Sequence, residues 1–433
     1  MTQPPSPAGW AHSLTQFLTV EAAGGIVLLA SASVALAVAN SPFAGGYEAF
    51  WKTPVGISAG ALVMEHSLRH WINDGLMAVF FLVVGLEVKR ELVIGELRER
   101  RAAMLPLAAA AGGMLVPAAA YLALQWGREG AAGWGIPMAT DIAFVVGCLA
   151  VLGPRVPHGL RIFVLSLAII DDIGAILVIA IGYSAGLNWV ALALGATGVA
   201  VSALLIRYGV VTVMPLAVAA VLTWLAFHES GVHATIAGVL LGLLAPARPA
   251  IPARQMTSAL DRLRRRIGYL QANDAAPKAV ATSLASAADA LQSPLERLEH
   301  ALHPFVSFVV MPVFALANAG VTLNVAAVAS PVAVAVAAGL VVGKPLGIVA
   351  FAWLAVNRGW TSLPAGVSWP LVLGAGCLAG VGFTMALFIA SLALDGPRLE
   401  HAKAGVLAGS LVAGMLGLWL IARAIAAPPH EDA

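Results

Sequence analysis

The sequence predicts an all-α protein that crosses a membrane many times. Hydrophobic residues make up 60% of its 433 positions and charged residues only 11%, whereas a soluble domain carries about 25% charged residues. The apolar residues also gather in long runs, and a helix that spans a bilayer needs about 20 of them. Membrane lipid is therefore the expected surroundings of the chain. The net charge of +2 gives no basic surface for a nucleic-acid partner.

Twelve apolar runs predict twelve transmembrane helices. They lie near residues 19–39, 71–88, 103–125, 132–151, 159–183, 188–206, 209–226, 231–246, 302–320, 332–356, 370–394 and 403–425. The shorter runs are acceptable because neighbouring helices can cover them inside a bundle. Residues 1–18 hold no lysine or arginine, unlike the basic start of a cleaved signal peptide, so we expect run 19–39 to be retained as the first span.

The positions of lysine and arginine predict the orientation, because cytoplasmic connections carry an excess of both. Of the 24 lysines and arginines, 18 lie in one set of alternate connections, five in the other set and one, Lys344, inside a span. This bias supports an even number of spans and places both termini in the cytoplasm.

The predicted spans divide the chain into five parts. These are a cytoplasmic tail at 1–18, spans one to eight at 19–246, a cytoplasmic connection at 247–300, spans nine to twelve at 301–425 and a cytoplasmic tail at 426–433. Residues 41–70 form a polar external connection after the first span. The 247–300 connection holds the basic cluster Arg262, Arg264, Arg265 and Arg266, which suits either a solvated loop or a regulatory or lipid-binding segment.

Three predicted spans carry ionisable residues at the same depth in the bilayer. Asp141, the adjacent pair Asp171 and Asp172, and Lys344 each lie near the middle of their run. An ionisable group at the bilayer centre costs roughly 2.5–3.5 kcal/mol on insertion scales, so such groups persist when they are paired, hydrated or functional. A buried aspartate–lysine pair that locks helices together is the structural alternative. One lysine cannot neutralise three carboxylates, so at least one carboxylate must bind a proton or a cation.

The two adjacent aspartates cannot face the same partner equally well, because neighbouring positions on a helix point about 100° apart. One of them can pair with Lys344 while the other faces a water-filled path. Burial and a nearby lysine act on a carboxylate in opposite directions, which lets protons and a metal ion compete for it near neutral pH. Oxygen ligands suit a hard cation such as Na⁺ or Li⁺. The pattern therefore indicates a site that exchanges the cation for protons.

Two predicted spans, near 132–151 and 370–394, should be interrupted. The first contains Gly135-Ile136-Pro137, and proline removes a backbone donor and disfavours helix in the residue before it. The second contains Gly374-Ala375-Gly376 and Gly380-Val381-Gly382, where glycine weakens the helix. Close helix packing also explains glycines in a span. Paired interruptions in the two halves nevertheless indicate inverted repeats, with crossing helices whose broken ends point at an ion site.

Four ordered motifs contain or adjoin these residues. They are Ala139-Thr140-Asp141-Ile142-Ala143-Phe144, Leu167-Ala168-Ile169-Ile170-Asp171-Asp172-Ile173-Gly174-Ala175, Gly343-Lys344-Pro345-Leu346-Gly347 and Gly380-Val381-Gly382-Phe383-Thr384-Met385. Together they resemble the motifs of the bacterial NhaA-type sodium–proton antiporters. The resemblance covers about residues 19 to 425 and is weak only in 247–292.

The resemblance implies a secondary transporter, not an enzyme, in the inner membrane of a bacterium, with no cofactor. It would exchange cytoplasmic Na⁺ or Li⁺ for external protons by alternating access, with more than one proton entering per sodium ion, and serve sodium and pH homeostasis. Asp172 would be the main cation ligand and Asp171 would pair with Lys344 in one state. Thr140 and Asp141 would assist the cation at the unwound crossing. A homodimer is also implied, through a β-hairpin in 41–70, although that connection shows no sharp turn motif.

The resemblance further implies a pH-sensing cluster at the cytoplasmic end of the spans. The residues carried over are Glu87, Arg90, Glu91, Glu299, His300 and His303, together with His233, which matches a histidine tied to the pH response. Glu87 and Glu91 lie four residues apart, on one face of a helix. The alternatives are an ordinary charged helix end for the cluster and an interfacial or packing role for His233.

Two other classes of function are open on the sequence. An intramembrane aspartyl protease would use Asp141 and Asp172 as a dyad that shares a proton, but a Gly-x-Gly-Asp motif is absent and Lys344 would disfavour the shared proton. A channel would use acidic residues as its filter, but channels often build the pore from symmetric copies and the charges here are asymmetric. Coupling to protons separates an antiporter from both classes.

Overall fold

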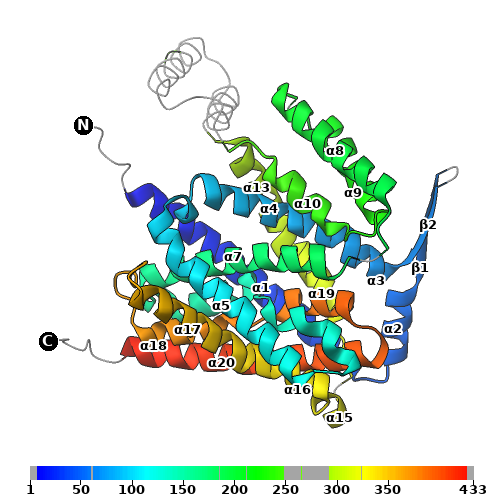
Figure 1. Ribbon diagram of the computed structural model, residues 1–433. Helices are drawn as coiled ribbons and strands as arrows, with labels where there is room; N and C mark the ends of the chain where they lie inside the picture. Colours follow the sequence, from blue (N-terminus) through cyan, green and yellow to red (C-terminus); the bar gives the residue numbers. More distant parts are fainter. Residues whose placement is uncertain are drawn as a thin grey trace, which may run out of the picture.

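The computed structural model describes residues 7–59, 62–184, 186–210, 212–247, 265, 292–322 and 324–426, most of them in helices (Figure 1). The first part of the chain contains α1 (Pro7–Ala39), α2 (Ala44–Lys52), β1 (Pro54–Ala59), β2 (Leu62–Ser67), α3 (Leu68–Trp71), α4 (Met77–Val93), α5 (Arg100–Leu124), α6 (Ile142–Leu152), α7 (His158–Gly182), α8 (Trp189–Arg207), α9 (Val213–His228) and α10 (Thr235–Leu243). The second part contains α13 (Pro294–Phe305), α14 (Met311–Asn318), α15 (Val325–Val328), α16 (Pro331–Ala338), α17 (Lys344–Asn357), α18 (Trp369–Ala379), α19 (Phe383–Ala393) and α20 (Gly396–Ala426).

Shorter helical segments join several of these helices. The 3-10 helices are Glu96–Arg98, Glu129–Met138 and Gly153–Arg155, and the π-helical turns are Ile72–Leu76, Val306–Val310 and Gly339–Gly343. Each π turn joins two α-helices without a break, so that the continuous helices Leu68–Val93, Pro294–Asn318 and Pro331–Asn357 result.

The helix lengths are those of a polytopic membrane protein. Among the described residues, seven helices are long and apolar enough to cross a membrane, and three bent helix pairs raise the number to ten if each pair is one span. Two of the twelve predicted runs, near 209–226 and 231–246, coincide with the short helices α9 and α10. The all-α membrane fold is therefore confirmed, while the count of twelve spans and the inverted repeats stay predictions.

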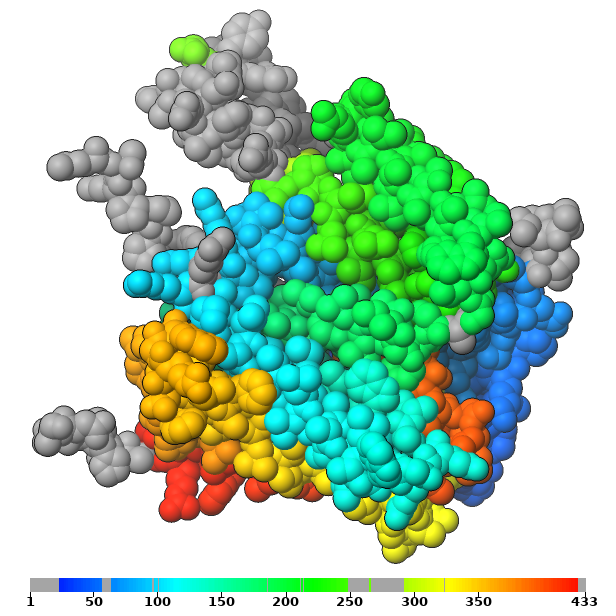
Figure 2. Space-filling view, in the orientation of Figure 1, coloured from blue at the N-terminus to red at the C-terminus, as the bar shows by residue number. Residues whose placement is uncertain are grey.

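The surface of the helix pair α8 and α9 suits lipid. The two helices pack against each other at the edge of the molecule (Figures 1 and 2). Their exposed side chains include Val190, Leu194, Val218 and Leu222. In water many exposed apolar side chains on one helix pair would favour aggregation, whereas in a bilayer they lie in their preferred solvent.

Small residues let the inner helices approach closely. A Cβ atom at Gly112 of α5 would collide with the carbonyl oxygen of Gly347 on α17. In the same way, a Cβ at Gly238 of α10 would collide with the carbonyl oxygen of Ala78 on α4. Close contact of this kind is the usual way in which helices associate in lipid, where burying apolar surface gives no advantage.

The β-hairpin lies at the opposite end of the molecule from the start of α1 and the end of α20 (Figure 1). Its strands β1 and β2 pair antiparallel, from Pro54 opposite Ser67 to Ala59 opposite Leu62. The connection predicted at 41–70 therefore contains a hairpin, which no turn motif in the sequence had indicated.

Several predicted connections lie partly outside the described residues. These parts include residues 1–6, 60–61, 248–264, 266–291 and 427–433, and with them Arg262, Arg264 and Arg266 of the basic cluster. Helix α1 begins at Pro7, inside the tail predicted at 1–18, and α13 begins at Pro294, inside the connection predicted at 247–300. Hydropathy marks where a helix enters lipid, and a helix can begin before that point.

Candidate functional site

The middle of α7 presents two buried carboxylates to the interior of the bundle. Asp171 and Asp172 are 1% and 2% exposed. Asp171 Oδ2 lies 2.9 Å from Nζ of Lys344, the first residue of α17, and both side chains are fully buried. Helix α5 packs against both α7 and α17 and so helps to hold this pair together. The two opposite charges offset each other at a depth where an isolated charge would be costly.

Thr140 lies in the non-helical break between the 3-10 helix Glu129–Met138 and α6. Its Oγ1 is 2.7 Å from Asp171 Oδ2 and 2.9 Å from the carbonyl oxygen of Ala379, the last residue of α18. A hydroxyl has one hydrogen, so Thr140 donates to only one of these two acceptors at a time.

Asp141 binds the beginnings of two helices. It precedes α6, and its Oδ1 accepts from the backbone N–H of Phe144 at 3.1 Å. Its Oδ2 accepts from Thr384 near the start of α19, at 3.1 Å from the backbone nitrogen and 2.5 Å from Oγ1. The N–H groups at a helix start lack partners within the helix and carry a partial positive charge, so one carboxylate stabilises both.

The two broken spans meet at this point with complementary charges. The backbone N–H of Asp141 donates to the carbonyl oxygen of Val381 at 2.8 Å. The carbonyl oxygen of Met138, where the 3-10 helix ends, accepts from Lys344 Nζ. Carbonyl groups at a helix end carry a partial negative charge. The helix starts thus face a carboxylate, and the ends face a lysine and the hydroxyl of Thr140.

Asp172 differs from its neighbour because it makes no hydrogen bond or ion pair with any residue that the structure describes. The charged groups that act on it are Glu87, Asp171, Asp141 and Lys344. Three of these four are carboxylates, so the local potential favours a positive partner at Asp172. The arrangement can hold a proton or a hard cation between carboxylate oxygens.

A second group of charges joins α4 and α13. Arg90 Nη1 pairs with Glu299, and Arg90 Nη2 lies 3.5 Å from Glu91 Oε1. Glu87 Oε1 lies 3.8 Å from Nε2 of His303. Glu87, Glu299 and His303 are buried. The structure therefore brings together five of the residues predicted for the pH-sensing cluster.

Of the other two histidines, His300 interacts with the cluster only through its chain neighbour Glu299, and His233 lies outside it. His300 is exposed, and its Nδ1 lies 2.8 Å from the carbonyl oxygen of Glu296 on its own helix. His233 Nε2 lies 3.6 Å from Asp74 Oδ1. Asp74 and Glu87 lie on the same continuous helix, about 20 Å apart at 1.5 Å per residue. His233 is therefore at the opposite end of that helix from the charges on α4 and α13.

Two groups of residues near the predicted site residues were not predicted from the sequence. Thr384 belongs to the glycine-rich motif of the second interrupted span, but its partner Asp141 is 243 residues away. Asp74 and its neighbours His66, His70 and His228 were not predicted either, although His233, which also contacts Asp74, was. The sequence does contain one indication of this group: His66 and His70 lie four residues apart, just before the second predicted span.

Comparison with known proteins covers nearly the whole chain. The sequence profile of the family described as Na⁺/H⁺ antiporter 1 matches residues 15–421. A protein of Rhodopirellula baltica named Na(+)/H(+) antiporter NhaA is 50% identical over 423 residues, which are 98% of this chain and 96% of that protein. A protein of the same name from Rhizobium meliloti is 48% identical over 403 residues, 93% of this chain and 92% of that protein.

A third relative, named Na(+)/H(+) antiporter NhaA 2 and found in Acidiphilium cryptum, is 48% identical over 95% of this chain and 92% of its own length. Proteins with these names are transporters and not enzymes, so the aspartyl protease alternative is excluded. The resemblance predicted from the four motifs is confirmed, and the chain belongs to the Na⁺/H⁺ antiporter 1 family, which includes the NhaA antiporters.

Proposed function

We propose that this protein exchanges Na⁺ or Li⁺ leaving the cytoplasm for protons entering it, with Asp172 as the main ligand of the cation. The observation that carries the proposal is a buried carboxylate without a described partner, next to a buried aspartate–lysine pair. An ionised carboxylate in this position is costly. A bound proton or a bound cation removes that cost, and only one of them fits the site at a time.

The neighbouring pair supports electrogenic exchange, in which more than one proton moves per sodium ion. Asp172 carries one proton when no cation is bound. The pair Asp171 and Lys344 holds a second exchangeable proton, which the lysine carries while the pair is intact. Binding of Na⁺ between Asp171 and Asp172 would separate Asp171 from Lys344 and release both protons.

Alternating access in this proposal comes from two groups of helices that rock around the broken spans. The breaks near Thr140 and Val381 contact each other through side-chain and backbone hydrogen bonds. Non-helical backbone at this depth is tolerated where it is buried in protein or lines a cavity, and it leaves the helix ends free to contact an ion.

The remaining parts of the proposal concern regulation and location. The charges on α4 and α13 would set the pH range of exchange. The protein would lie in the bacterial inner membrane with both termini in the cytoplasm and the hairpin outside, and it would form a homodimer. Its role would be sodium and pH homeostasis.

The test uses everted membrane vesicles that hold a pH gradient driven by respiration. Addition of NaCl should dissipate the gradient, as followed with a fluorescent dye, and KCl should not. Asp172→Asn should abolish the sodium response, because an amide cannot carry the proton or the charge, while the protein remains inserted and folded. Asp395→Asn, at an exposed aspartate, is the matched control and should respond like wild type.

Two outcomes would reject the proposal. Sodium-driven proton release that persists in Asp172→Asn would show that this carboxylate is not the ligand. Sodium uptake without proton movement in the wild-type protein would indicate a channel. The amount of each variant in the membrane and its melting temperature confirm that the proteins are present and folded.

A further inference from the structure

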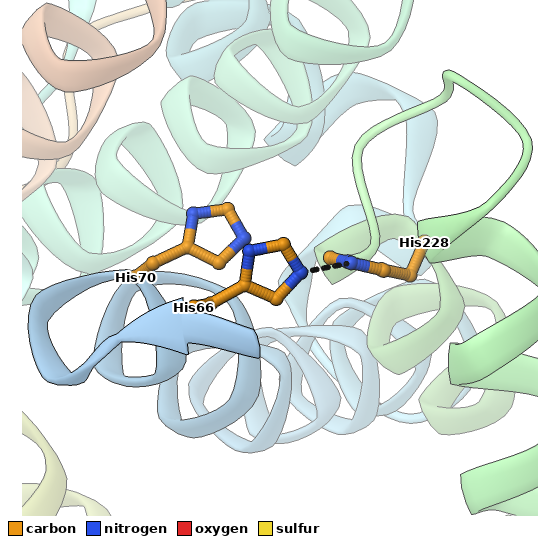
Figure 3. A group of neighbouring side chains, drawn as sticks. All are labelled: His66, His70 and His228. Atoms are coloured by element: carbon orange, nitrogen blue, oxygen red, sulfur yellow. Dashed lines mark hydrogen bonds between the residues drawn. The ribbon is translucent and has the colours of Figure 1, made fainter. Parts of the chain in front are cut away.

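Three histidines gather near the hairpin, far from the residues proposed to carry out transport. His66 comes from β2, His70 from α3 and His228 from the end of α9 (Figure 3). One ring nitrogen from each lies within 4.8 Å of the other two. All three side chains are half-buried. Imidazole is the commonest side-chain ligand of transition metals, so the group has the composition of a metal site.

Asp74 determines which nitrogen of His228 is available. His228 Nδ1 lies 3.1 Å from Asp74 Oδ2. An ionised carboxylate only accepts hydrogen bonds, so Nδ1 carries the hydrogen and the neutral ring has its lone pair on Nε2. A carboxylate behind a histidine in this way is the usual support for a metal-binding imidazole, because it fixes both the tautomer and the ring orientation.

The nitrogen of His228 that carries the lone pair, Nε2, faces a nitrogen of His66 at the distance expected for two ligands of one metal ion. Nε2 of His228 and Nε2 of His66 are 3.3 Å apart. Two nitrogens bound to one tetrahedral Zn²⁺ at about 2.0–2.1 Å are themselves about 3.3–3.4 Å apart. The ring of His70 lies beside that of His66, with centroids 4.3 Å apart. A rotation of the His70 side chain that brings its nitrogen closer to the other two would complete three ligands with Zn–N bonds of that length.

The surrounding charges favour a cation. Arg69, the neighbour of His70 in the chain, donates two hydrogen bonds of 2.8 and 3.2 Å to the carboxylate of Glu48, which balances its charge. Asp74 supplies a negative charge, its Oδ2 lying 3.5 Å from His70 Nε2. That nitrogen is buried and has no hydrogen-bond partner among the described residues. A buried nitrogen without such a partner is costly, and a small rotation toward a metal would give it one.

We propose that His66, His70 and His228 form a binding site for Zn²⁺, in which Asp74 orients His228 as a positioning residue. Three imidazole ligands leave the fourth tetrahedral position for water. The bound ion would join the hairpin and α3 to the end of α9, segments that the hydrogen bond between His66 and His228 already links across 162 residues. The proposal concerns binding alone and is independent of the transport proposal.

The experiment measures Zn²⁺ bound to purified wild-type protein in detergent, after removal of any affinity tag. Titration calorimetry with ZnCl₂ should give one equivalent of tight binding per chain. His66→Ala and His228→Ala should each weaken this binding at least tenfold. Asp74→Asn should weaken it about 10- to 100-fold, as loss of an orienting carboxylate generally does. Co²⁺ in place of Zn²⁺ should show the visible absorption of a four-coordinate ion.

The matched control is His158→Ala, which removes an exposed histidine at the start of α7. It should bind Zn²⁺ like wild type. Gel filtration and melting curves without metal establish that each variant is folded, and added Zn²⁺ should raise the melting temperature of wild type but not of His66→Ala. Wild type without stoichiometric binding, or equal binding by wild type and His66→Ala, would overturn the proposal and leave a cluster of histidines that only share protons with Asp74.

Discussion

At the scale of single residues, the site depends on few side chains that stabilise one another. Lys344 pairs with Asp171 and donates to the carbonyl oxygen of Met138. Asp141 accepts from both α6 and α19. Lys344 thus both balances a second charge and completes the end of a helix, while Asp141 completes the beginnings of two helices.

Lys344→Ala should lower both stability and exchange. The variant leaves Asp171 buried without its partner, and loss of one member of a buried ion pair costs about 3–5 kcal/mol. Melting of the purified protein in detergent measures the stability. The double variant Lys344→Ala with Asp171→Asn should recover part of the loss, because no buried charge remains.

The control for this prediction is Lys52→Ala. Lys52 also pairs with a carboxylate, that of Glu48, but its side chain is 69% exposed. Exposed pairs contribute about 0–1 kcal/mol, so this variant should melt close to wild type. A Lys344→Ala protein as stable as Lys52→Ala would contradict a stabilising role for the buried pair.

The charged residues of the site could be predicted from the sequence, but most of their contacts could not. Asp141, Asp171, Asp172 and Lys344 could be selected because charge is rare in apolar runs and costly there. The pattern of residues alone could not decide which of the two adjacent aspartates faces Lys344, since they are neighbours on the same helix; the resemblance implied Asp171, which forms the ion pair with Lys344 in the structure. The role of Thr384 could not be predicted from the sequence, because threonine is common in membrane helices and only the fold brings Thr384 to Asp141.

At the scale of elements, irregular helix occurs at positions for which a function is proposed. The π turn Gly339–Gly343 precedes Lys344 directly, and the turn Ile72–Leu76 contains Asp74. A π turn holds one more residue than an α turn and often lies at a functional site. Here it changes the direction of the side chains that follow. The proline and glycine motifs predicted the two interrupted spans, but neither those motifs nor the hydropathy pattern indicated the π turns.

Gly112→Ala should destabilise the contact between α5 and α17. The added Cβ would collide with the carbonyl oxygen of Gly347 and the ring of Phe351, and overpacking of this kind costs about 1–3 kcal/mol. Gly147→Ala in α6 is the control, because a Cβ there would have no atom within 4 Å. A lower melting temperature for Gly112→Ala alone is the expected result, whereas equal melting temperatures would show that α5 and α17 can move apart without cost.

At the scale of the whole molecule, one helix connects two groups of titratable residues. The continuous helix Leu68–Val93 carries Asp74 near the hairpin and Glu87 and Arg90 near α13. Its α4 part also packs against α7, which bears Asp171 and Asp172. A change of charge at Glu87 can therefore act on Asp172 through space and through the position of α4.

Glu87→Gln and Glu299→Gln should shift the pH profile of exchange without abolishing it. Each change removes a buried carboxylate that contacts His303 or Arg90, while the ion ligands stay in place. The profile is measured in everted vesicles over a range of pH. Glu65→Gln, at an exposed position of the hairpin, should keep the wild-type profile. If the pH profiles of Glu87→Gln and Glu299→Gln coincide with that of Glu65→Gln, the cluster is an ordinary charged helix end and not a pH sensor.

The hairpin should be needed for the proposed homodimer. Replacement of residues 54–67 by a short flexible linker should convert the purified protein to a monomer, as measured by light scattering in detergent, because the strands β1 and β2 project from one end of the molecule (Figure 1). A dimer that survives this replacement would place the interface elsewhere.

The overall architecture could be predicted in outline because hydropathy and the distribution of lysine and arginine are properties of long segments. The number of spans was harder to predict, because α9 and α10 coincide with two predicted runs but are short helices. The hairpin was implied only by the resemblance to the antiporter family, because its strands carry no turn motif. The histidine cluster was missed because His228 is far in sequence from His66 and His70.

The hydroxyl of Thr140 has one hydrogen and two possible acceptors, so it links the two broken spans. While Asp171 is ionised it takes that hydrogen, and the end carbonyl of α18 at Ala379 is left without it. In the proposed exchange, a cation bound at Asp171 would compete with the hydroxyl for that carboxylate, and the hydroxyl would turn to Ala379. Cation binding at α7 would thereby affect a helix end 239 residues from Thr140, by rotation of one O–H bond and before any helix has moved.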